Sequence, residues 1–147
     1  MTQEDSQLRY MKVYVLGNPL VAADSLPLKL LPKLRNALPD IEFIETDPTE
    51  NFIPEANSII VDTVLGITKV TRFNSIDEFE IFRSVTAHDY DLSLHLQLLK
   101  KLGKLKEVKI IGIPVKGNQQ IALKKSISVI LNLFQDLMTS DAETSSA

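Results

Sequence analysis

The sequence predicts an α/β fold, a three-layer sandwich with helices on both faces of a twisted, mostly parallel sheet of about five strands. Short apolar runs rich in β-branched residues alternate with longer segments of helical periodicity. The runs at 58–62 and 107–114 have the composition of buried strands. The chain has 147 residues, 44% of them hydrophobic. We therefore expect one domain over residues 11–138, with flexible termini at 1–10 and 139–147.

The composition excludes several classes of protein. The formal net charge of −3 disfavours nucleic-acid binding, which needs a concentrated basic face. The chain has no cysteine, so disulfides, thiolate metal ligands and a cysteine nucleophile are all excluded, and a reducing cytoplasm fits. No apolar run approaches the roughly 18–20 residues that span a bilayer, and the N-terminus lacks the apolar core of a signal peptide. We expect a cytoplasmic protein without membrane or nucleic-acid partners.

The first α/β unit opens at residues 12–17, an apolar run that is predicted to be a strand. This run ends at Gly17 and Asn18, a turn signal. Asp24 follows six residues after Asn18, and Ser25 is a candidate N-cap for the next helix. In open α/β sheets, ligands bind beyond the carboxyl ends of the strands, so Asp24 marks the expected site.

The next elements follow from periodicity. A helix is predicted after Ser25, with Pro27 in its first turn and a kink at Pro32, and its apolar residues are Leu30, Leu31, Leu34 and Leu38. Residues 41–45 alternate with period two and form a predicted strand that ends at Glu45.

Three more strands and two helices complete the prediction. The strand at 58–62 ends in Asp62, which should share a sheet edge with Asp24. Residues 67–73 resemble an edge strand, with 79–82 as its candidate partner. The last strand and helix are expected at 107–114 and 119–138.

The segment Thr86-Ala87-His88-Asp89 has the form of a capping box and predicts the start of a helix that runs through Lys101. His88 would lie in its first turn. The apolar stripe of this helix would consist of Leu92, His95, Leu96, Leu99 and Leu102.

Asp24, Asp62 and His88 have metal-ligand chemistry, and each lies at a predicted junction after or before a regular element. Two carboxylates and one imidazole suit a divalent cation of borderline hardness, and they leave coordination positions open for another ligand. Each residue also has a structural interpretation, because aspartates often cap strand ends and a histidine often starts a helix on the surface. Both interpretations stay open at this point, whereas His95 within a leucine stripe favours a structural role.

The chain resembles the nickel-iron hydrogenase maturation endopeptidases over most of residues 11–138. The strongest element is Gly-Asn-Pro-Leu at 17–20 followed by Asp24, which is similar to the family's Gly-Asn-x-Leu and acidic motif after the first strand. The strand ending in Asp62 and the segment around His88 resemble the family's two further ligand segments. The resemblance implies that these three residues bind metal and act in catalysis.

The sequence also departs from the family pattern. Val15 stands at the family's earlier glycine, Ala23 at the first acid of its usual pair, and 25–27 at its glycine-rich continuation. After the last strand, the segment 112–114 replaces the usual Gln-Pro motif. These differences indicate a divergent branch.

The resemblance implies a specific activity, namely removal of the C-terminal extension of a nickel-iron hydrogenase large-subunit precursor after nickel insertion. The partner would be the nickel-loaded precursor and the cofactor Ni²⁺, largely supplied by that precursor, with other divalent cations as substitutes. Asn18 and Glu45 would support the metal ligands without binding the metal themselves. We expect the protease to be a monomer.

Two alternatives remain from the residues alone. In a receiver-like signalling domain, Asp62 would accept a phosphoryl group and Lys116 would be the partner lysine. A receiver, however, requires an acidic pair directly after its first strand, where this chain has Gly17 and Asn18. In a non-catalytic α/β binding module, the carboxylates would only cap loops.

Overall fold

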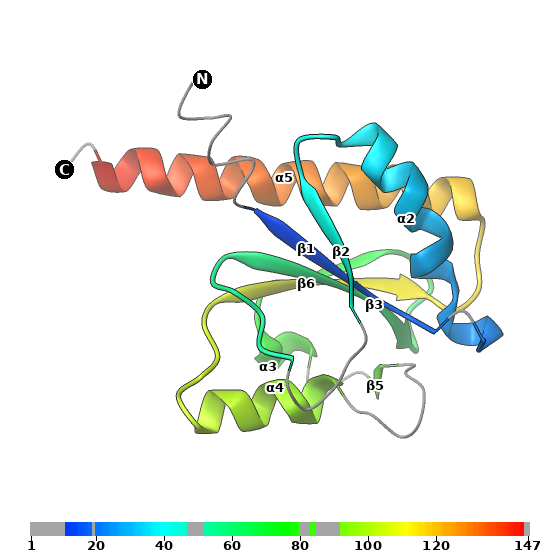
Figure 1. Cartoon of the computed structure of the whole chain (residues 1–147), viewed down its shortest axis with the longest axis horizontal. Helices are drawn as coiled ribbons and strands as arrows, with labels where there is room; N and C mark the ends of the chain where they lie inside the picture. Colours follow the sequence, from blue (N-terminus) through cyan, green and yellow to red (C-terminus); the bar gives the residue numbers. More distant parts are fainter. Residues whose placement is uncertain (1–10, 19, 47–51, 80–82, 85–91, 146–147) are drawn as a thin grey trace.

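A six-stranded sheet forms the centre of the computed structural model (Figure 1). The structure describes residues 11–18, 20–46, 52–79, 83–84 and 92–145, with the backbone alone for 83–84 and 137–145. The strands are β1 (Lys12–Leu16), β2 (Glu42–Thr46), β3 (Ser58–Leu65), β4 (Thr71–Phe73), β5 (Arg83–Ser84) and β6 (Val108–Pro114).

The sheet is mostly parallel, as the sequence predicts. Its strand order is β2-β1-β3-β6-β4, and β1 pairs in parallel with β2 and β3, while β3 pairs in parallel with β6. Strand β4 is antiparallel to β6, and the short β5 pairs antiparallel with the end of β3. The carboxyl ends of β1, β2, β3 and β6 therefore lie along one edge of the sheet.

Helices cover both faces of the sheet, so the predicted three-layer sandwich is confirmed (Figure 1). Helices α2 (Leu26–Ala37) and α5 (Gln119–Ser145) lie on one face, and α3 (Ile76–Phe79) and α4 (Leu92–Lys101) on the other. Strand β3 serves both cores, because Ile59 and Val61 pack in the α2 and α5 cluster while Ile60 and Val64 pack in the α3 and α4 cluster. This double burial explains its continuous apolar run.

The structure corrects the predicted strand boundaries. Strand β3 does not end at Asp62 but continues to Leu65, because the β-branched Thr63 and Val64 still pair with β6. The strand predicted at 67–73 is limited to β4 and pairs with β6. The candidate partner at 79–82 is wrong at Phe79, which lies in α3, and residues 80–82 lie outside the described residues.

The structure also corrects the helices. Helix α5 continues to Ser145 instead of ending at 138, since no proline or glycine follows to stop it. Leu102 is 58% exposed and does not join the buried stripe of α4. Helix α4 ends at Lys101, and Gly103 with φ of 70° turns the chain. Pro32 is exposed, and α2 runs on past it.

No helix in the described part of the chain is long and apolar enough to cross a membrane.

Candidate active site

The loop between β1 and α2 folds back tightly on the end of its own strand. A Cβ at Gly17 would lie only 2.8 Å from the backbone oxygen of Asp24 and 3.1 Å from Cγ of Leu28. The backbone N–H of Asn18 donates to that same oxygen of Asp24 over 2.9 Å. Glycine at position 17 thus allows the close approach that brings Asp24 to the top of β1.

Asn18 organises the rest of this loop. Its side-chain Oδ1 accepts the N–H of Leu20 at 2.9 Å, an Asx turn, and its carbonyl accepts the N–H of Val21 at 3.1 Å. The N–H of Asp24 donates to the carbonyl of Val21 at 2.9 Å, closing the short 3₁₀ turn η1 (Ala22–Asp24). The Gly-Asn pair therefore has a mechanical role, which is to position the acidic side chain six residues later.

Ser25 does not cap α2 as predicted. Its hydroxyl donates back to the carbonyl of Ala22 at 3.0 Å, and the first turn of α2 receives no side-chain cap hydrogen bond from Ser25. Ser25 has helical φ and ψ of −100° and −16°, whereas an N-cap residue usually has an extended backbone. The 3₁₀ turn runs almost directly into the helix, so the serine closes η1 instead.

The Asp24 carboxyl is buried with only 1% of its surface exposed. Burial raises its pKa to about 6, while the Thr63 hydroxyl and the backbone of Asn18 act in the opposite direction. The Thr63 hydroxyl lies close enough to the Asp24 carboxyl to lower its pKa, but the two groups do not form a hydrogen bond of ordinary geometry. Oδ1 of Asp24 and Oγ1 of Thr63 thus lack hydrogen-bond partners among the described residues. A buried, poorly satisfied carboxylate is costly, which makes Asp24 a functional candidate.

Asp62 is completely buried within β3. Its partner across β6 is Gly112, where a Cβ would lie 2.9 Å from Cε2 of Phe73 and 3.0 Å from Cγ2 of Val64. These contacts place Gly112 and Asp62 in the row of the sheet that faces α3 and α4. Close packing beside Asp62 therefore explains why glycine stands at position 112, within the segment that departs from the family motif.

The two aspartates approach the end of the sheet from different faces. Thr63, beside Asp24, continues the row of Ile59 and Val61, which faces α2 and α5, so Asp62 points to the opposite side. Strand β1 ends at Leu16, level with Asp62 in the register set by the preceding pair. Both aspartates thus lie at the carboxyl edge, but Asp24 is on the face of α2 and α5 and Asp62 is on the face of α3 and α4.

The third predicted ligand, His88, lies outside the described residues. Among the described residues, no group of three or more His, Cys, Asp or Glu side chains could hold a metal ion. Glu45, expected at the end of its strand, lies within β2, paired with Val15, and its side chain is exposed.

His95 has the structural role that its place in a leucine stripe predicts. The Nε2 atom lies 2.6 Å from the carbonyl oxygen of Phe52, and the two rings stack with centroids 6.4 Å apart and planes 18° from parallel. These contacts hold the segment before β3 against α4.

Thr63, whose hydroxyl lies next to the Asp24 carboxyl, is not among the site residues that the sequence predicts. A possible signal was its position directly after Asp62 at the predicted end of a buried strand, where ligands of α/β proteins gather. The predicted strand ends at Asp62, so Thr63 is not expected to lie within β3.

The fold is that of hydrogenase maturation proteases, so the predicted resemblance is confirmed at the level of the fold. The [NiFe] hydrogenase maturation protease HycI from Thermococcus kodakarensis KOD1 is 14% identical and superposes with a TM-score of 0.53, covering 86% of this chain and 93% of its own. A hydrogenase 3 maturation protease is 17% identical, with a TM-score of 0.52 and coverage of 87% and 89%. No protein-family model and no curated protein matches the sequence.

Proposed function

We propose that this chain is an endopeptidase that removes the C-terminal extension from a nickel-iron hydrogenase large-subunit precursor. In this proposal, the nickel that the precursor already carries is bound by Asp24, Asp62 and His88. The fold shared with hydrogenase maturation proteases over most of the chain supports the reaction class.

One observation carries the proposal, namely the loop that brings Asp24 to the sheet edge. Gly17 and Asn18 force this loop back on β1 and hold a carboxyl with an orphaned Oδ1 next to β3. A carboxylate that only capped a loop could lie at the surface, where water stabilises its ionised form. Burial destabilises the ionised form of Asp24, so a structural role alone does not explain it. The orphaned Oδ1 is the atom that Asp24 would contribute to a donor set of carboxylate oxygens and an imidazole nitrogen.

The chemistry of the proposed reaction divides between precursor and protease. Nickel in the precursor would supply a Lewis acid close to the scissile bond. The protease residues would bind and orient this substrate, so that the peptide bond lies where water can attack it. Asp24 and Asp62 are 1% and 0% exposed, so precursor binding must displace whatever covers them.

Cleavage of a nickel-loaded precursor tests the proposal directly. Wild-type protein should release the C-terminal peptide, detected by mass spectrometry, while Asp24→Asn and His88→Ala should each reduce the rate by at least about a hundredfold. Asp40→Asn changes an exposed aspartate far from β1's end and should cleave normally. A nickel-free precursor should remain intact.

Two results would contradict the proposal. Undiminished cleavage by both variants would remove these residues from the reaction. No cleavage by folded wild-type protein, together with no association with the precursor, would favour the non-catalytic α/β module.

A further inference from the structure

Helix α4 is apolar on two opposite faces. Leu92, Leu96 and Leu99 are at most 5% exposed and pack in the core. On the other side, Leu94 and Leu98 are 62% and 54% exposed, and Leu102, just past the end of the helix, is 58% exposed. These three leucines are spaced four residues apart and form a ridge of about 12 Å along the outer surface. We call them the α4 ridge.

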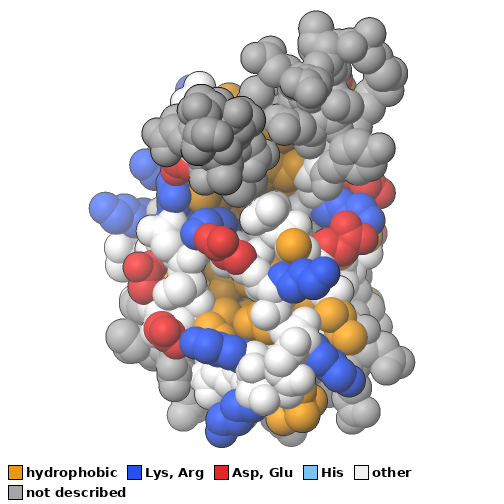
Figure 2. Space-filling view, turned by 90° about the vertical axis from the view of Figure 1, so that its left-hand side faces the viewer, with side chains coloured by type: hydrophobic (Ala, Val, Ile, Leu, Met, Phe, Trp, Pro, Cys, Tyr) orange, Lys and Arg blue, Asp and Glu red, His pale blue; other side chains and the backbone are white. Residues whose placement is uncertain are grey.

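Lysines surround the end of this ridge. Lys100, Lys101, Lys104 and Lys106 lie within seven residues, although the whole chain carries a net charge of −3. Lys101 is seven residues from Leu94, so it lies on the same face as the ridge. We call these four lysines the basic cap. The end of α4 lies low on the face shown in Figure 2, where blue side chains frame hydrophobic atoms.

The basic cap is hardly neutralised by the described parts of the chain. Lys100 meets Asp77 at 3.5 Å, but both side chains are largely exposed, at 58% and 73%. Lys101, Lys104 and Lys106 form no ion pair with a described acidic residue.

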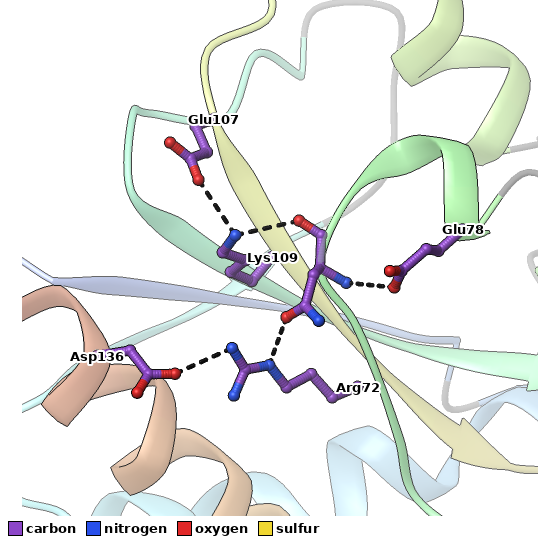
Figure 3. Close-up of polar contacts among 6 residues, drawn as sticks. Arg72, Glu78, Glu107, Lys109 and Asp136 are labelled. Atoms are coloured by element: carbon purple, nitrogen blue, oxygen red, sulfur yellow. Dashed lines mark hydrogen bonds and ion pairs between the residues drawn. The ribbon is translucent and has the colours of Figure 1, made fainter. Parts of the chain in front are cut away.

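The acidic residue that follows the basic cap in the sequence already has another partner. Figure 3 shows Glu107 bound to Lys109 at 3.1 Å. Among the described acidic residues, only Asp77 therefore meets a lysine of the basic cap, and a partner with acidic side chains would add opposite charge there.

A recess lies on the flank of the basic cap. Its volume is about 270 Å³, and its lining includes Lys100, Leu105, Lys106 and Glu107. The recess thus combines two lysines of the basic cap with apolar surface, next to the turn at Gly103 that ends α4. An acidic side chain or chain end of a partner could enter it.

We propose that the α4 ridge and the basic cap form a docking surface for an acidic amphipathic helix of a partner protein. Leucine-type side chains of that helix would pack along the α4 ridge, and its Asp and Glu side chains would meet the basic cap. Apolar contact supplies most of the affinity in such a groove or ridge, and charge complementarity selects an acidic partner over a basic one. This proposal does not depend on the peptidase activity.

Binding of two synthetic peptides to the full-length chain tests the proposal. Both peptides have about 18 residues, long enough to form a helix, with leucines repeating every three to four residues. One carries Glu at its polar positions and the other carries Lys. We expect the acidic peptide to bind at least about tenfold more tightly, with affinity falling as salt rises. In NMR spectra, the shifted resonances should belong to residues 92–106 and to the other residues that line the recess, 74–76 and 107–108.

Substitutions on two helices make the test specific. Leu94→Ser with Leu98→Ser, or Lys101→Glu with Lys104→Glu, should weaken binding of the acidic peptide about tenfold or more. The matched controls lie on α5, where Ile121 and Leu131 are 68% and 43% exposed and two lysines follow each other. Ile121→Ser with Leu131→Ser, and Lys124→Glu with Lys125→Glu, should bind as wild type does.

Several results would overturn the proposal. These are no binding of the acidic peptide, equal binding of both peptides, or shifts confined to residues outside 92–106 and the lining of the recess. A dimer of the wild-type chain that the ridge variant abolishes in sedimentation would assign the surface to a second copy. Binding to vesicles of anionic lipid in preference to the acidic peptide would assign it to a membrane.

Discussion

At the scale of single residues, the loop after β1 connects sequence and chemistry. Gly17 permits the close approach, Asn18 fixes the turn by hydrogen bonds, and Asp24 is the side chain that this arrangement buries. Each of the three does a different physical task. Substitutions at two of them should therefore have different signatures.

Asp24→Asn should change the pH dependence of stability. The folded pKa of Asp24 is raised to about 6 from 3.8, so the folded state holds the proton more tightly than the unfolded state. Protonated Asp24 therefore adds to the free energy of unfolding, and this added stability is complete below about pH 4. The added stability is lost as the pH rises to about 6, and above that pH it does not change further. The shift corresponds to about 3 kcal/mol at most, of which about 2 kcal/mol falls between pH 4 and pH 6.5.

Urea unfolding at several pH values checks this prediction. The stability of Asp24→Asn relative to wild type should increase by about 2 kcal/mol between pH 4 and pH 6.5. The exposed control Asp40→Asn should show no such increase. A difference between Asp24→Asn and wild type that does not change with pH would contradict the burial of an ionisable Asp24.

Gly17→Ala should destabilise the fold and disturb the Asp24 loop. The new Cβ would lie 2.8 Å from the backbone oxygen of Asp24, and a backbone atom cannot move as cheaply as a side-chain end. We expect the free energy of unfolding in urea to fall by about 1–3 kcal/mol. We also expect a change in the pH step of Asp24, by which we mean the loss of stability between pH 4 and pH 6.5 that Asp24 causes.

Gly103→Ala is the matched control. Nothing lies within 4 Å of its new Cβ, and its φ of 70° costs backbone strain alone. It should leave the pH step of Asp24 unchanged. An unaltered step in Gly17→Ala as well would mean that the close approach does not position Asp24.

At the scale of elements, α4 shows how one helix serves two surfaces. Its inner leucines complete the core on the α3 and α4 face, and its outer leucines form the α4 ridge. Hydrophobic periodicity locates the helix, but the sequence alone cannot say which leucines face inward, because both sides carry them.

Two substitutions on α4 separate its faces. Leu96→Ala removes a side chain that is fully buried and should cost about 2–4 kcal/mol of stability in urea unfolding. Leu98→Ala removes an exposed side chain and should change stability by less than about 0.5 kcal/mol. Equal losses in the two variants would mean that the outer face of α4 is packed and would also remove the basis of the docking surface.

At the scale of the whole molecule, the sheet collects side chains that the sequence separates. The β1 to α2 loop and β3 meet at the carboxyl edge, where Asp24 lies beside Thr63, 39 positions later in the printed sequence. The basic cap lies at the opposite, amino-terminal side of the sheet, where β6 begins. The basic cap and the Asp24 loop therefore occupy opposite edges of the sheet.

The sequence by itself determined the alternation of strands and helices, the buried character of β3 and the turn at Gly17 and Asn18. These features are encoded locally, in side-chain periodicity and in the backbone freedom of glycine. Only the tertiary structure decided that β3 continues past Asp62, that β4 pairs with β6, and that Asp24 meets Thr63 while Asp62 faces the other core. Strand pairing and burial depend on contacts between distant segments, and no local pattern fixes which segments those will be.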